Sequence, residues 1–315
     1  PAGAPRGAAP PPAGRRPGAA PAPGPTRRAP SPPAPGVGLA RVVSPVQPPL
    51  PGEGSWTVTA GTPEHPAVAT TLVRPDAVHT SVVVGVMRVD PRLAHLTLLA
   101  GTDQPDGTSS SGGQVPAAMR PSLLAAFNAG FRMKEANGGW FGEGRTAVPL
   151  RDGSATLVLR DDGRADVGVW GRDDRMDPHV TGVRQNLALL IDGGHLVPGT
   201  GSSDSPLWGK TLGHKVLVPR SGVGITADGA LVYVGGPALS VETLARTLLA
   251  AGAVRAMELD INNQWVEADT FQPGPVGPIG TKLVDTLHYP ADHYLHPQSR
   301  DFVAVTAATP TPALR

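Results

Sequence analysis

The chain of 315 residues contains no cysteine and carries 27 basic and 26 acidic side chains. The lack of cysteine excludes a disulfide framework, a thiolate metal site and a cysteine nucleophile. There is no apolar run of about 18 residues or more, so we expect no membrane-spanning helix.

The first 53 residues differ in composition from the rest of the chain. Of the 37 prolines, 17 fall in Pro1–Pro51, together with six arginines and no acidic residue. This segment lacks the apolar periodicity of a core, so we predict a disordered or polyproline-like tether over residues 1–53. Its composition resembles the spacer of an exported actinobacterial protein, which predicts a secreted or cell-envelope location. The arginines could attach the tether to anionic lipid or wall polymer, with solvated linker charge as the alternative.

The rest of the chain is acidic. Outside Pro1–Pro51, 21 basic residues face 26 acidic residues, which leaves a net charge near −5. No basic patch interleaved with aromatic residues is present either. We therefore expect no nucleic-acid partner.

From residue 56 onward, short β-rich runs alternate with turn signals, four of which are Asp-Gly pairs. The runs cover residues 56–60, 81–89, 95–100, 155–159, 187–191, 230–234, 255–260 and 302–306. This pattern predicts an α+β fold, with a β-rich mixed sheet and a few packed helices. We expect one globular domain over residues 54–307 and a flexible tail over residues 308–315.

Two segments have helical patterns. The stronger one begins at Ser240 as N-cap, places Leu244, Leu248 and Leu249 on one side, and ends at Gly252. It leads directly into the strand predicted over residues 255–260. A weaker helix is predicted over residues 116–125.

Two acidic residues stand at the end of that strand. Glu258 and Asp260 are two positions apart, so both side chains should leave the same face of the strand. This spacing suits a shared metal ion or an acid/base pair. In the alternative interpretation, Glu258 pairs with Arg255 or another basic residue, and Asp260 caps the following turn.

Two further segments combine glycine with a polar side chain. Asn128 and Gly130 follow the apolar run at residues 123–126, at the end of a predicted buried strand. Arg220 and Gly222 open another strand. A guanidinium can form two hydrogen bonds with phosphate, and glycine lets an oxyanion approach the backbone. A bare turn after the first strand and an exposed arginine on the second are the alternatives.

Together and in order, these segments resemble the phosphodiester glycosidase family, whose animal member is the uncovering enzyme, N-acetylglucosamine-1-phosphodiester alpha-N-acetylglucosaminidase. The resemblance covers about residues 118–271, and the sequence looks similar to an actinobacterial branch. The family motifs Asn-Gly-Gly-Phe-Phe, Arg-Thr-Ala-x-Gly and Leu-Asp-Gly-Gly-Gly-Ser correspond, respectively, to Asn128–Phe131 with its neighbours, to Arg220–Gly224 and to the segment that begins at Leu259.

The chain departs from the family after Asp260. The family has glycines and serine where this chain has Ile261, Asn262, Asn263 and Gln264. These side chains occupy space that a substrate phosphate or sugar would otherwise use. The two asparagines therefore join the predicted substrate-binding residues, and the departure implies a changed substrate.

The resemblance implies an exported hydrolase that cleaves a glycosidic bond, namely a sugar 1-phosphodiester in cell-envelope polymer or glycoconjugate. Asp260 would be the principal catalytic carboxylate and Glu258 its partner, Arg220 would stabilise phosphate charge, and Asn128 would orient the substrate. No cofactor is required, although a divalent cation such as calcium could bind Asp260 and neighbouring amide oxygens. The alternative is a noncatalytic wall-polysaccharide-binding module on a proline-rich stalk.

Overall fold

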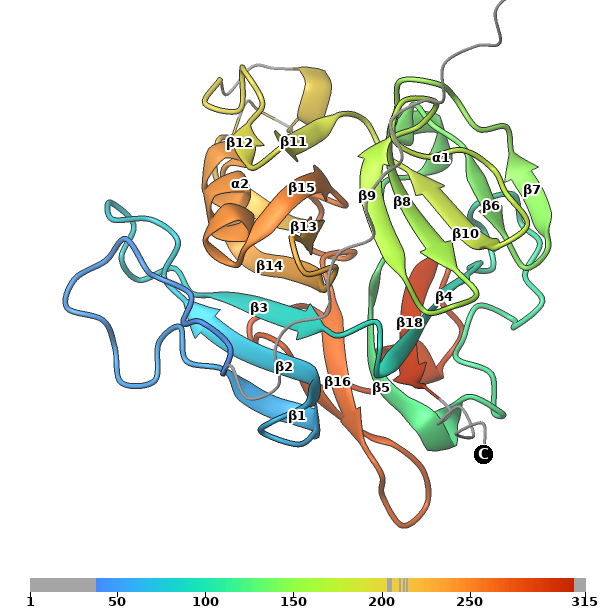
Figure 1. Cartoon of the computed structure of the whole chain (residues 1–315), viewed down its shortest axis with the longest axis horizontal. Helices are drawn as coiled ribbons and strands as arrows, with labels where there is room; N and C mark the ends of the chain where they lie inside the picture. Colours follow the sequence, from blue (N-terminus) through green and yellow to red (C-terminus); the bar gives the residue numbers. More distant parts are fainter. Residues whose placement is uncertain (1–37, 203–205, 210, 212, 214, 309–315) are drawn as a thin grey trace, which may run out of the picture. The chain divides into compact units, whose positions relative to one another are not determined.

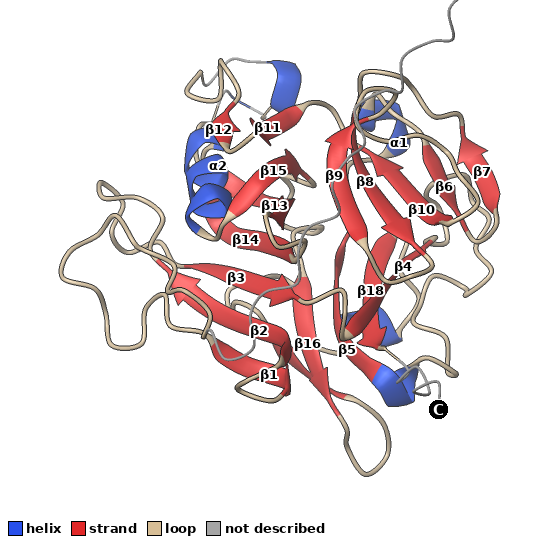
Figure 2. Ribbon diagram, viewed as in Figure 1, coloured by secondary structure: helices blue, strands red, loops and turns tan. Residues whose placement is uncertain are grey.

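The structure is a computed structural model that describes residues 38–202, 206–209, 211, 213 and 215–308. These residues belong to one compact unit in which β-strands predominate and helices are few, as predicted (Figures 1 and 2). Residues 1–37 of the predicted tether and residues 309–315 of the predicted tail lie outside the described residues. None of the described helices has the length and hydrophobicity needed to cross a membrane.

The largest sheet has eight strands within the described part of the chain, in the order β1-β2-β3-β14-β13-β15-β11-β12. The strands are β1 (Thr57–Gly61), β2 (Pro66–Val73), β3 (Val84–Val89), β11 (Leu189–Asp192), β12 (His195–Leu196), β13 (Val218–Thr226), β14 (Leu231–Leu239) and β15 (Ala253–Glu258). A tight turn joins β13 to β14, and its Gly229 has a φ of 86°, a left-handed conformation that glycine adopts without steric cost. β15 pairs with the other edge of β13, and this pairing places Asp260 next to Ser221 near the start of β13.

The described residues also form two five-stranded sheets. One has the order β17-β16-β5-β18-β4, and the other has the order β7-β6-β10-β8-β9. The first comprises β4 (Ala94–Leu99), β5 (Leu123–Asn128), β16 (Ala268–Gln272), β17 (Ile279–Lys282) and β18 (Phe302–Ala307), and the second β6 (Trp140–Gly142), β7 (Arg145–Val148), β8 (Ala155–Arg160), β9 (Ala165–Val169) and β10 (Val180–Gln185). Neighbouring strands in all three sheets run antiparallel, rather than in the mixed directions predicted.

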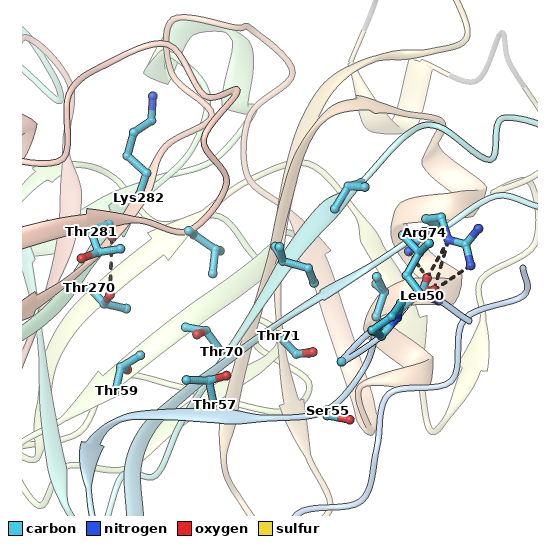
Figure 3. Close-up of a pocket in the computed structure, with 17 residues that line it drawn as sticks. Leu50, Ser55, Thr57, Thr59, Thr70, Thr71, Arg74, Thr270, Thr281 and Lys282 are labelled. Atoms are coloured by element: carbon cyan, nitrogen blue, oxygen red, sulfur yellow. Dashed lines mark hydrogen bonds and ion pairs between the residues drawn. The ribbon is translucent and has the colours of Figure 1, made fainter. Parts of the chain in front are cut away.

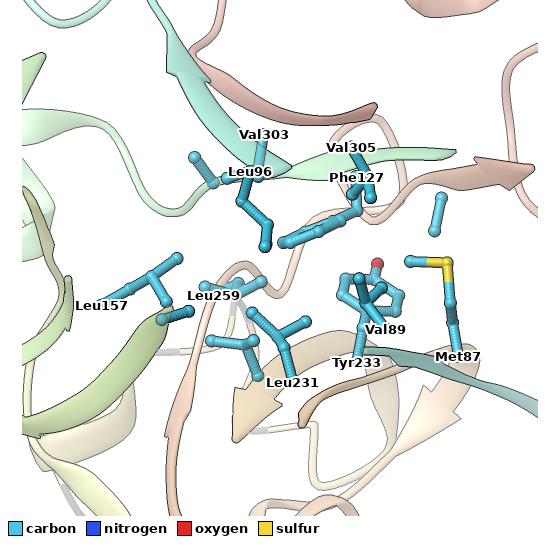
Figure 4. Close-up of a cluster of buried hydrophobic side chains, with 14 of the residues drawn as sticks. Met87, Val89, Leu96, Phe127, Leu157, Leu231, Tyr233, Leu259, Val303 and Val305 are labelled. Carbon is cyan, nitrogen blue, oxygen red and sulfur yellow. The ribbon is translucent and has the colours of Figure 1, made fainter. Parts of the chain in front are cut away.

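The main hydrophobic core lies where the three sheets face one another (Figure 4). The rings of Phe127 on β5 and Tyr233 on β14 lie 5.2 Å apart, between centroids, and both side chains are fully buried. Leu157 on β8 and Leu259 after β15 belong to the same cluster. Because β5 and β15 both contribute to this core, their ends hold Asn128 and Asp260 close together.

The predicted helix at residues 240–252 is confirmed as α2 (Val241–Ala250). Ser240 is the N-cap, and its side chain accepts a hydrogen bond from the backbone N–H of Thr243. Leu244 and Leu248 are fully buried in a second core between α2 and the eight-stranded sheet. This packing fixes the end of α2 that leads into β15.

The helix predicted over residues 116–125 is wrong. Only Arg120–Ser122 is helical there, as the short 3-10 helix η1, and β5 begins at Leu123. Pro121 lies within η1 and has no N–H to donate. The apolar residues that suggested a helix instead enter β5, where pairing with β18 and β16 outweighs their local helical spacing.

Residues 38–53, assigned above to the tether, pack against the domain in the structure. Val42 and Val46 are buried. Glu53 is also buried, and it accepts hydrogen bonds from the side chain of Arg74 at 2.7 Å and from the Arg74 backbone N–H at 2.8 Å. These contacts place the start of the folded domain earlier in the chain than residue 54.

The remaining short helices are α1 (Met133–Ala136), η2 (Pro206–Trp208) and η4 (His293–Leu295). α1 follows β5, and η4 precedes β18. Both therefore lie close in sequence to strand ends that meet at the candidate site.

Candidate active site

Asp260 lies just past the end of β15 and is 1% exposed. Its Oδ1 accepts hydrogen bonds from the backbone N–H groups of Ile261 at 2.7 Å and Asn262 at 2.9 Å. Its Oδ2 accepts one from Nη2 of Arg300 at 3.1 Å. Burial raises the pKa of Asp260 to about 6, and Arg300 with the two backbone donors opposes that rise. Asp260 is therefore rigidly held and ionises near neutral pH.

Glu258 has a different partner. It is fully buried on β15, and its Oε1 accepts a hydrogen bond from Nη1 of Arg220. Oε2 of Glu258 has no hydrogen-bond partner within the described part of the chain. Burial raises the pKa of Glu258 to about 7, although the Arg220 guanidinium opposes this rise. A carboxyl group in this setting can hold its proton near neutral pH.

Arg220 is occupied by groups of the protein itself. Besides its contact with Glu258, its Nε donates to the backbone oxygen of Leu239 at 3.0 Å, and the residue is 3% exposed. Gly222 lies opposite Glu258 in the β13–β15 pair, and a Cβ there would lie 3.1 Å from Cδ1 of Leu248 on α2. Arg220 and Gly222 thus support the packing of β13 instead of facing a cavity.

The two predicted carboxylates therefore do not share one ligand in this structure, because each pairs with its own arginine. The pairing of Glu258 with a base and the capping of the following turn by Asp260 agree with the alternative interpretation of the sequence. The bond between Asp260 and Arg300 goes beyond that interpretation. It connects Asp260 to residues that no sequence motif had indicated.

Asn128 joins three strands at this point. Its Nδ2 donates to Oγ of Ser221 at 3.0 Å, and its Oδ1 accepts from the Tyr233 hydroxyl at 2.9 Å. The Ser221 backbone N–H donates to the carbonyl oxygen of Asp260 at 2.9 Å. Asn128 thus positions the backbone that carries Asp260, and it also lines a small cavity beside that backbone.

Gly130 lies against a buried ion pair. Arg184, at the end of β10, is fully buried and donates through Nε to Oδ2 of Asp301 at 2.7 Å, and its other nitrogens donate to the backbone oxygens of Phe131 and Gln185. A Cβ at Gly130 would lie 3.1 Å from Cζ of Arg184. Because all three nitrogens of this guanidinium are hydrogen-bonded, Arg184 cannot move aside, and position 130 has no room for a side chain.

Arg300 is the least satisfied charged group of this cluster. It is 8% exposed, yet Nε and Nη1 have no hydrogen-bond partner among residues that the structure describes. Its guanidinium carbon lies 4.8 Å from the ring centroid of Trp265. Both line a cavity of about 10 Å³, to which Asn128, Gly130, His293 and Asp301 also contribute. This volume is about that of one water-sized probe.

The sequence analysis missed Arg184, Arg300, Asp301 and Trp265. The available signals were an arginine at the end of an apolar strand and the Arg300-Asp301 dipeptide directly before the predicted strand at residues 302–306. Charged residues at such positions are rarely buried unless they are paired. Their partners, however, are more than a hundred residues away for the Arg184–Asp301 pair, which sequence spacing cannot reveal.

Asn262 and Asn263 form an exposed turn beside Arg300. The Asn262 backbone oxygen accepts from the N–H of Trp265 at 2.8 Å, and the Asn262 Oδ1 accepts from the N–H of Gln264 at 2.9 Å. Asn262, Asn263 and Gln264 are all exposed. The turn therefore covers the cavity from outside and is closed by its own hydrogen bonds.

The cluster does not fit a divalent cation. Both carboxylate oxygens of Asp260 accept from N–H donors, and the Arg300 guanidinium lies beside them. Across the described residues, no group of three or more His, Asp or Glu side chains is arranged to hold a metal ion. The donor groups left at Arg300 instead suit an anion.

A second pair of acidic residues lies nearby on the chain. Glu267 and Asp269 at β16 are 1% and 0% exposed, and both carboxyl oxygens of Asp269 lack a hydrogen-bond partner in the described part. Burial raises the pKa of Glu267 to about 7, and burial together with Glu267 raises that of Asp269 to about 9. The folded protein therefore holds Asp269 protonated at neutral pH.

A much larger cavity, of about 500 Å³, lies away from this cluster (Figure 3). It is formed by β1, β2, β16 and β17, and none of the predicted site residues lines it. Threonine side chains predominate on its polar walls, among them Thr57, Thr59, Thr70, Thr270 and Thr281. Its size suits a small ligand, but it contains no acid/base pair for hydrolysis.

Comparison with family models finds a match over part of the chain. Residues 122–260 match the family model of the phosphodiester glycosidases. This region is therefore similar to a phosphodiester glycosidase domain. The match begins just before β5 and ends on Asp260, so it contains Asn128, Arg220 and Glu258. Arg300 and the Asn262–Trp265 turn lie beyond it.

One solved structure has a fold similar to that of this chain. The catalytic domain of zebrafish N-acetylglucosamine-1-phosphodiester alpha-N-acetylglucosaminidase, auto-inhibited by its pro-peptide, has a TM-score of 0.50 and 15% identity, over 81% of this chain and 88% of that chain. A hypothetical protein from Synechocystis has a TM-score of 0.38 and 13% identity, over 72% of this chain and 59% of that chain. No curated protein matches the sequence. The likeness to the zebrafish domain concerns the fold.

Proposed function

We propose that the protein is an exported hydrolase that cleaves the glycosidic bond of a sugar 1-phosphodiester in cell-envelope polymer or glycoconjugate. The observation that carries this proposal is the family match over residues 122–260, which ends on a carboxylate held beside a partly unpaired guanidinium. The composition of the proline-rich first 53 residues supports export to the cell envelope, where such polymers occur.

Asp260 is the proposed catalytic carboxylate. Cleavage of the bond between C1 of the sugar and the phosphate oxygen leaves positive charge near C1, and an ionised carboxylate stabilises that charge. Water adds to C1, the phosphomonoester leaves with the bonding electron pair, and one proton is released. Because a phosphomonoester is already a good leaving group, the site needs a cation near the phosphate more than it needs a strong acid.

Glu258 and Arg220 are proposed to act through the backbone of Asp260. Their ion pair joins β13 to β15 two residues before Asp260, and neither side chain lines the small cavity. Removing either partner would leave the other charge buried and unpaired, which is strongly destabilising. These two residues therefore position the end of β15 from which Asp260 extends.

A noncatalytic polysaccharide-binding module remains the second candidate. The observation that favours it is the open, threonine-lined cavity of about 500 Å³, since hydroxyl groups are common partners for sugars. The candidate active site, in contrast, has a cavity of only about 10 Å³. In this second candidate, polymer would bind across β1 and β17 and would not be cleaved.

An assay for products separates the two functions. We expect the purified protein to release reducing sugar and phosphomonoester from sugar 1-phosphodiesters, with equal rates in the presence and absence of a chelator because the cluster does not fit a cation. Saturable polymer binding without release of either product would contradict the hydrolase. In that case Thr57→Val and Thr281→Val should weaken the binding, since both side chains line the larger cavity.

A further inference from the structure

We propose that Arg300 binds the phosphate of the substrate once the Asn262–Trp265 turn moves aside. This inference rests on the proposed function and names the residue that recognises the charged part of the substrate. It transfers the phosphate-binding role that the sequence suggested for Arg220 to a residue outside the matched family region.

The first argument is the state of the Arg300 side chain. A guanidinium has five N–H donors, and burial without partners is costly for each of them. Arg300 uses Nη2 on Asp260, while Nε and Nη1 have no partner among the described residues, although the side chain is only 9% exposed. Arg184, fully buried close by, engages all three of its nitrogens. The contrast shows that this fold can satisfy a buried arginine and has left Arg300 available.

The second argument is the charge of the surroundings. Arg184 pairs with Asp301, and Arg300 pairs with Asp260, so the two ion pairs are neutral together. The other ionisable side chains on the cavity wall are His293 and Tyr294. Burial lowers the pKa of His293 to about 4 and raises the pKa of Tyr294 above its ordinary value, so both are neutral at pH 7. A phosphodiester carries one negative charge, and planar guanidinium donors match its oxygens. An anion in this cavity would therefore meet the N–H donors of Arg300, and no unpaired carboxylate on the cavity wall would repel it.

The third argument concerns the Asn262–Trp265 turn, which covers the cavity. A cavity of about 10 Å³ cannot hold phosphate, so the turn over it must move. The turn is held by hydrogen bonds within itself, by the hydrogen bond from the Asn262 backbone N–H to Oδ1 of Asp260, and by stacking of Trp265 on Arg300. A cation–π contact of this kind is a weak interaction at a partly exposed site. Phosphate binding can replace that contact, because charge-assisted hydrogen bonds are stronger than neutral ones.

The position of Arg300 also suits the reaction. Its Nη2 holds the proposed catalytic carboxylate, so a phosphate bound to the other nitrogens of the same guanidinium lies next to Asp260. The negative charge that develops on the leaving phosphomonoester would then be stabilised where it forms.

Arg300→Lys tests the proposal. Lysine keeps a positive charge beside Asp260 but removes the fork of donors. For the phosphodiester that the wild type cleaves, we expect KM to rise by about 10-fold or more, because several charge-assisted hydrogen bonds are lost. For a neutral aryl glycoside of the same sugar, which offers no phosphate to the guanidinium, the rise in KM should be several-fold smaller. The matched control is Arg164→Lys, at an exposed arginine paired with Asp162, which should alter neither value.

The two substrates distinguish the roles of Arg300. An unchanged KM for the phosphodiester, or an equal change for both substrates, would overturn the phosphate-binding role while leaving the hydrolase intact. If the wild type cleaves neither substrate, the proposed function fails, and calorimetry with inorganic phosphate still tests the residue. We expect wild-type binding in the millimolar range that Arg300→Lys abolishes, whereas equal binding by both proteins, or none by the wild type, contradicts the proposal.

A second variant leaves Arg300 in place. Trp265→Ala removes the stacked ring and should let inorganic phosphate bind at least as tightly as in the wild type. Weaker phosphate binding by this variant would show that the ring is part of the site and not its cover, and would overturn the proposed opening.

Discussion

Asp260→Asn is expected to lower kcat/KM for a sugar 1-phosphodiester by about 10²- to 10⁴-fold, the range typical for loss of a catalytic acid or base. The amide keeps one oxygen as acceptor but carries no negative charge to stabilise the developing cation at C1. Because Arg300 also loses its counter-charge, we expect a loss of stability of about 1–3 kcal/mol as well. Initial rates and urea denaturation of the same preparation separate the two effects.

Asp90→Asn is the matched control for this variant. Asp90 is 4% exposed and, like Asp260, accepts from a backbone N–H two residues ahead and from an arginine, here the N–H and the side chain of Arg92. It should lose similar stability and keep wild-type turnover. Equal losses of activity in both variants, or full activity in Asp260→Asn, would remove Asp260 from the chemistry.

The pH profile gives an independent view of the same carboxylate. Since burial raises the pKa of Asp260 to about 6, the group becomes ionised as the pH rises through that value. Rates should therefore increase between pH 5 and pH 7. Glu258→Gln keeps a hydrogen-bonding group for Arg220. If ionisation of Asp260 causes the increase in rate between pH 5 and pH 7, this variant should show the same increase.

Asp269→Asn is expected to stabilise the protein at pH 8 and to have little effect at pH 4. The folded-state pKa of Asp269 is about 9, and in an unfolded chain it is near the ordinary value of about 4. The folded state therefore binds the proton more tightly, and its contribution to stability is complete below pH 4 and is lost as the pH rises toward 9. Asparagine imitates the protonated form and cannot lose it.

The size of this gain in stability follows from the raised pKa of Asp269, at about 1.4 kcal/mol per pKa unit. Coupling to the titration of Glu267 makes the gain smaller. We expect a gain of about 2 kcal/mol or more at pH 8, measured by urea denaturation. Asp285→Asn, at an exposed aspartate in the same region of the chain, should change stability by less than about 0.5 kcal/mol at either pH. If Asp269→Asn were less stable than the wild type at both pH values, the ionised carboxylate of Asp269 would be the form that stabilises the fold.

Local patterns predicted the elements that carry Asp260 but not its partners. Ser240, the leucines of α2 and Gly252 marked the helix, and the apolar run after it marked β15, because caps and periodicity act over a few residues. β15 ends at Glu258, so Asp260 lies beyond the strand and the same-face argument for the two carboxylates did not predict their contacts.

The arginines were predicted less well, because register decides their contacts. Arg255 is the nearest base to Glu258 in sequence, but it pairs with Asp166 on β9, while the β13 neighbour Arg220 reaches Glu258. Arg300 reaches Asp260 from just before β18, 40 positions further along the chain. The order of strands in the sheets brings these residues together, and the local patterns of a single sequence do not reveal that order.

Hydrolysis in water enriched in ¹⁸O tests the central claim that the glycosidic bond is the one cleaved. Attack at C1 leaves the original oxygen on phosphorus, so mass spectrometry of the released phosphomonoester should find no ¹⁸O. The phosphomonoester is the informative product, because a reducing sugar exchanges its anomeric oxygen with water. Incorporation of one ¹⁸O into the phosphomonoester would show attack at phosphorus and would contradict the glycosidase.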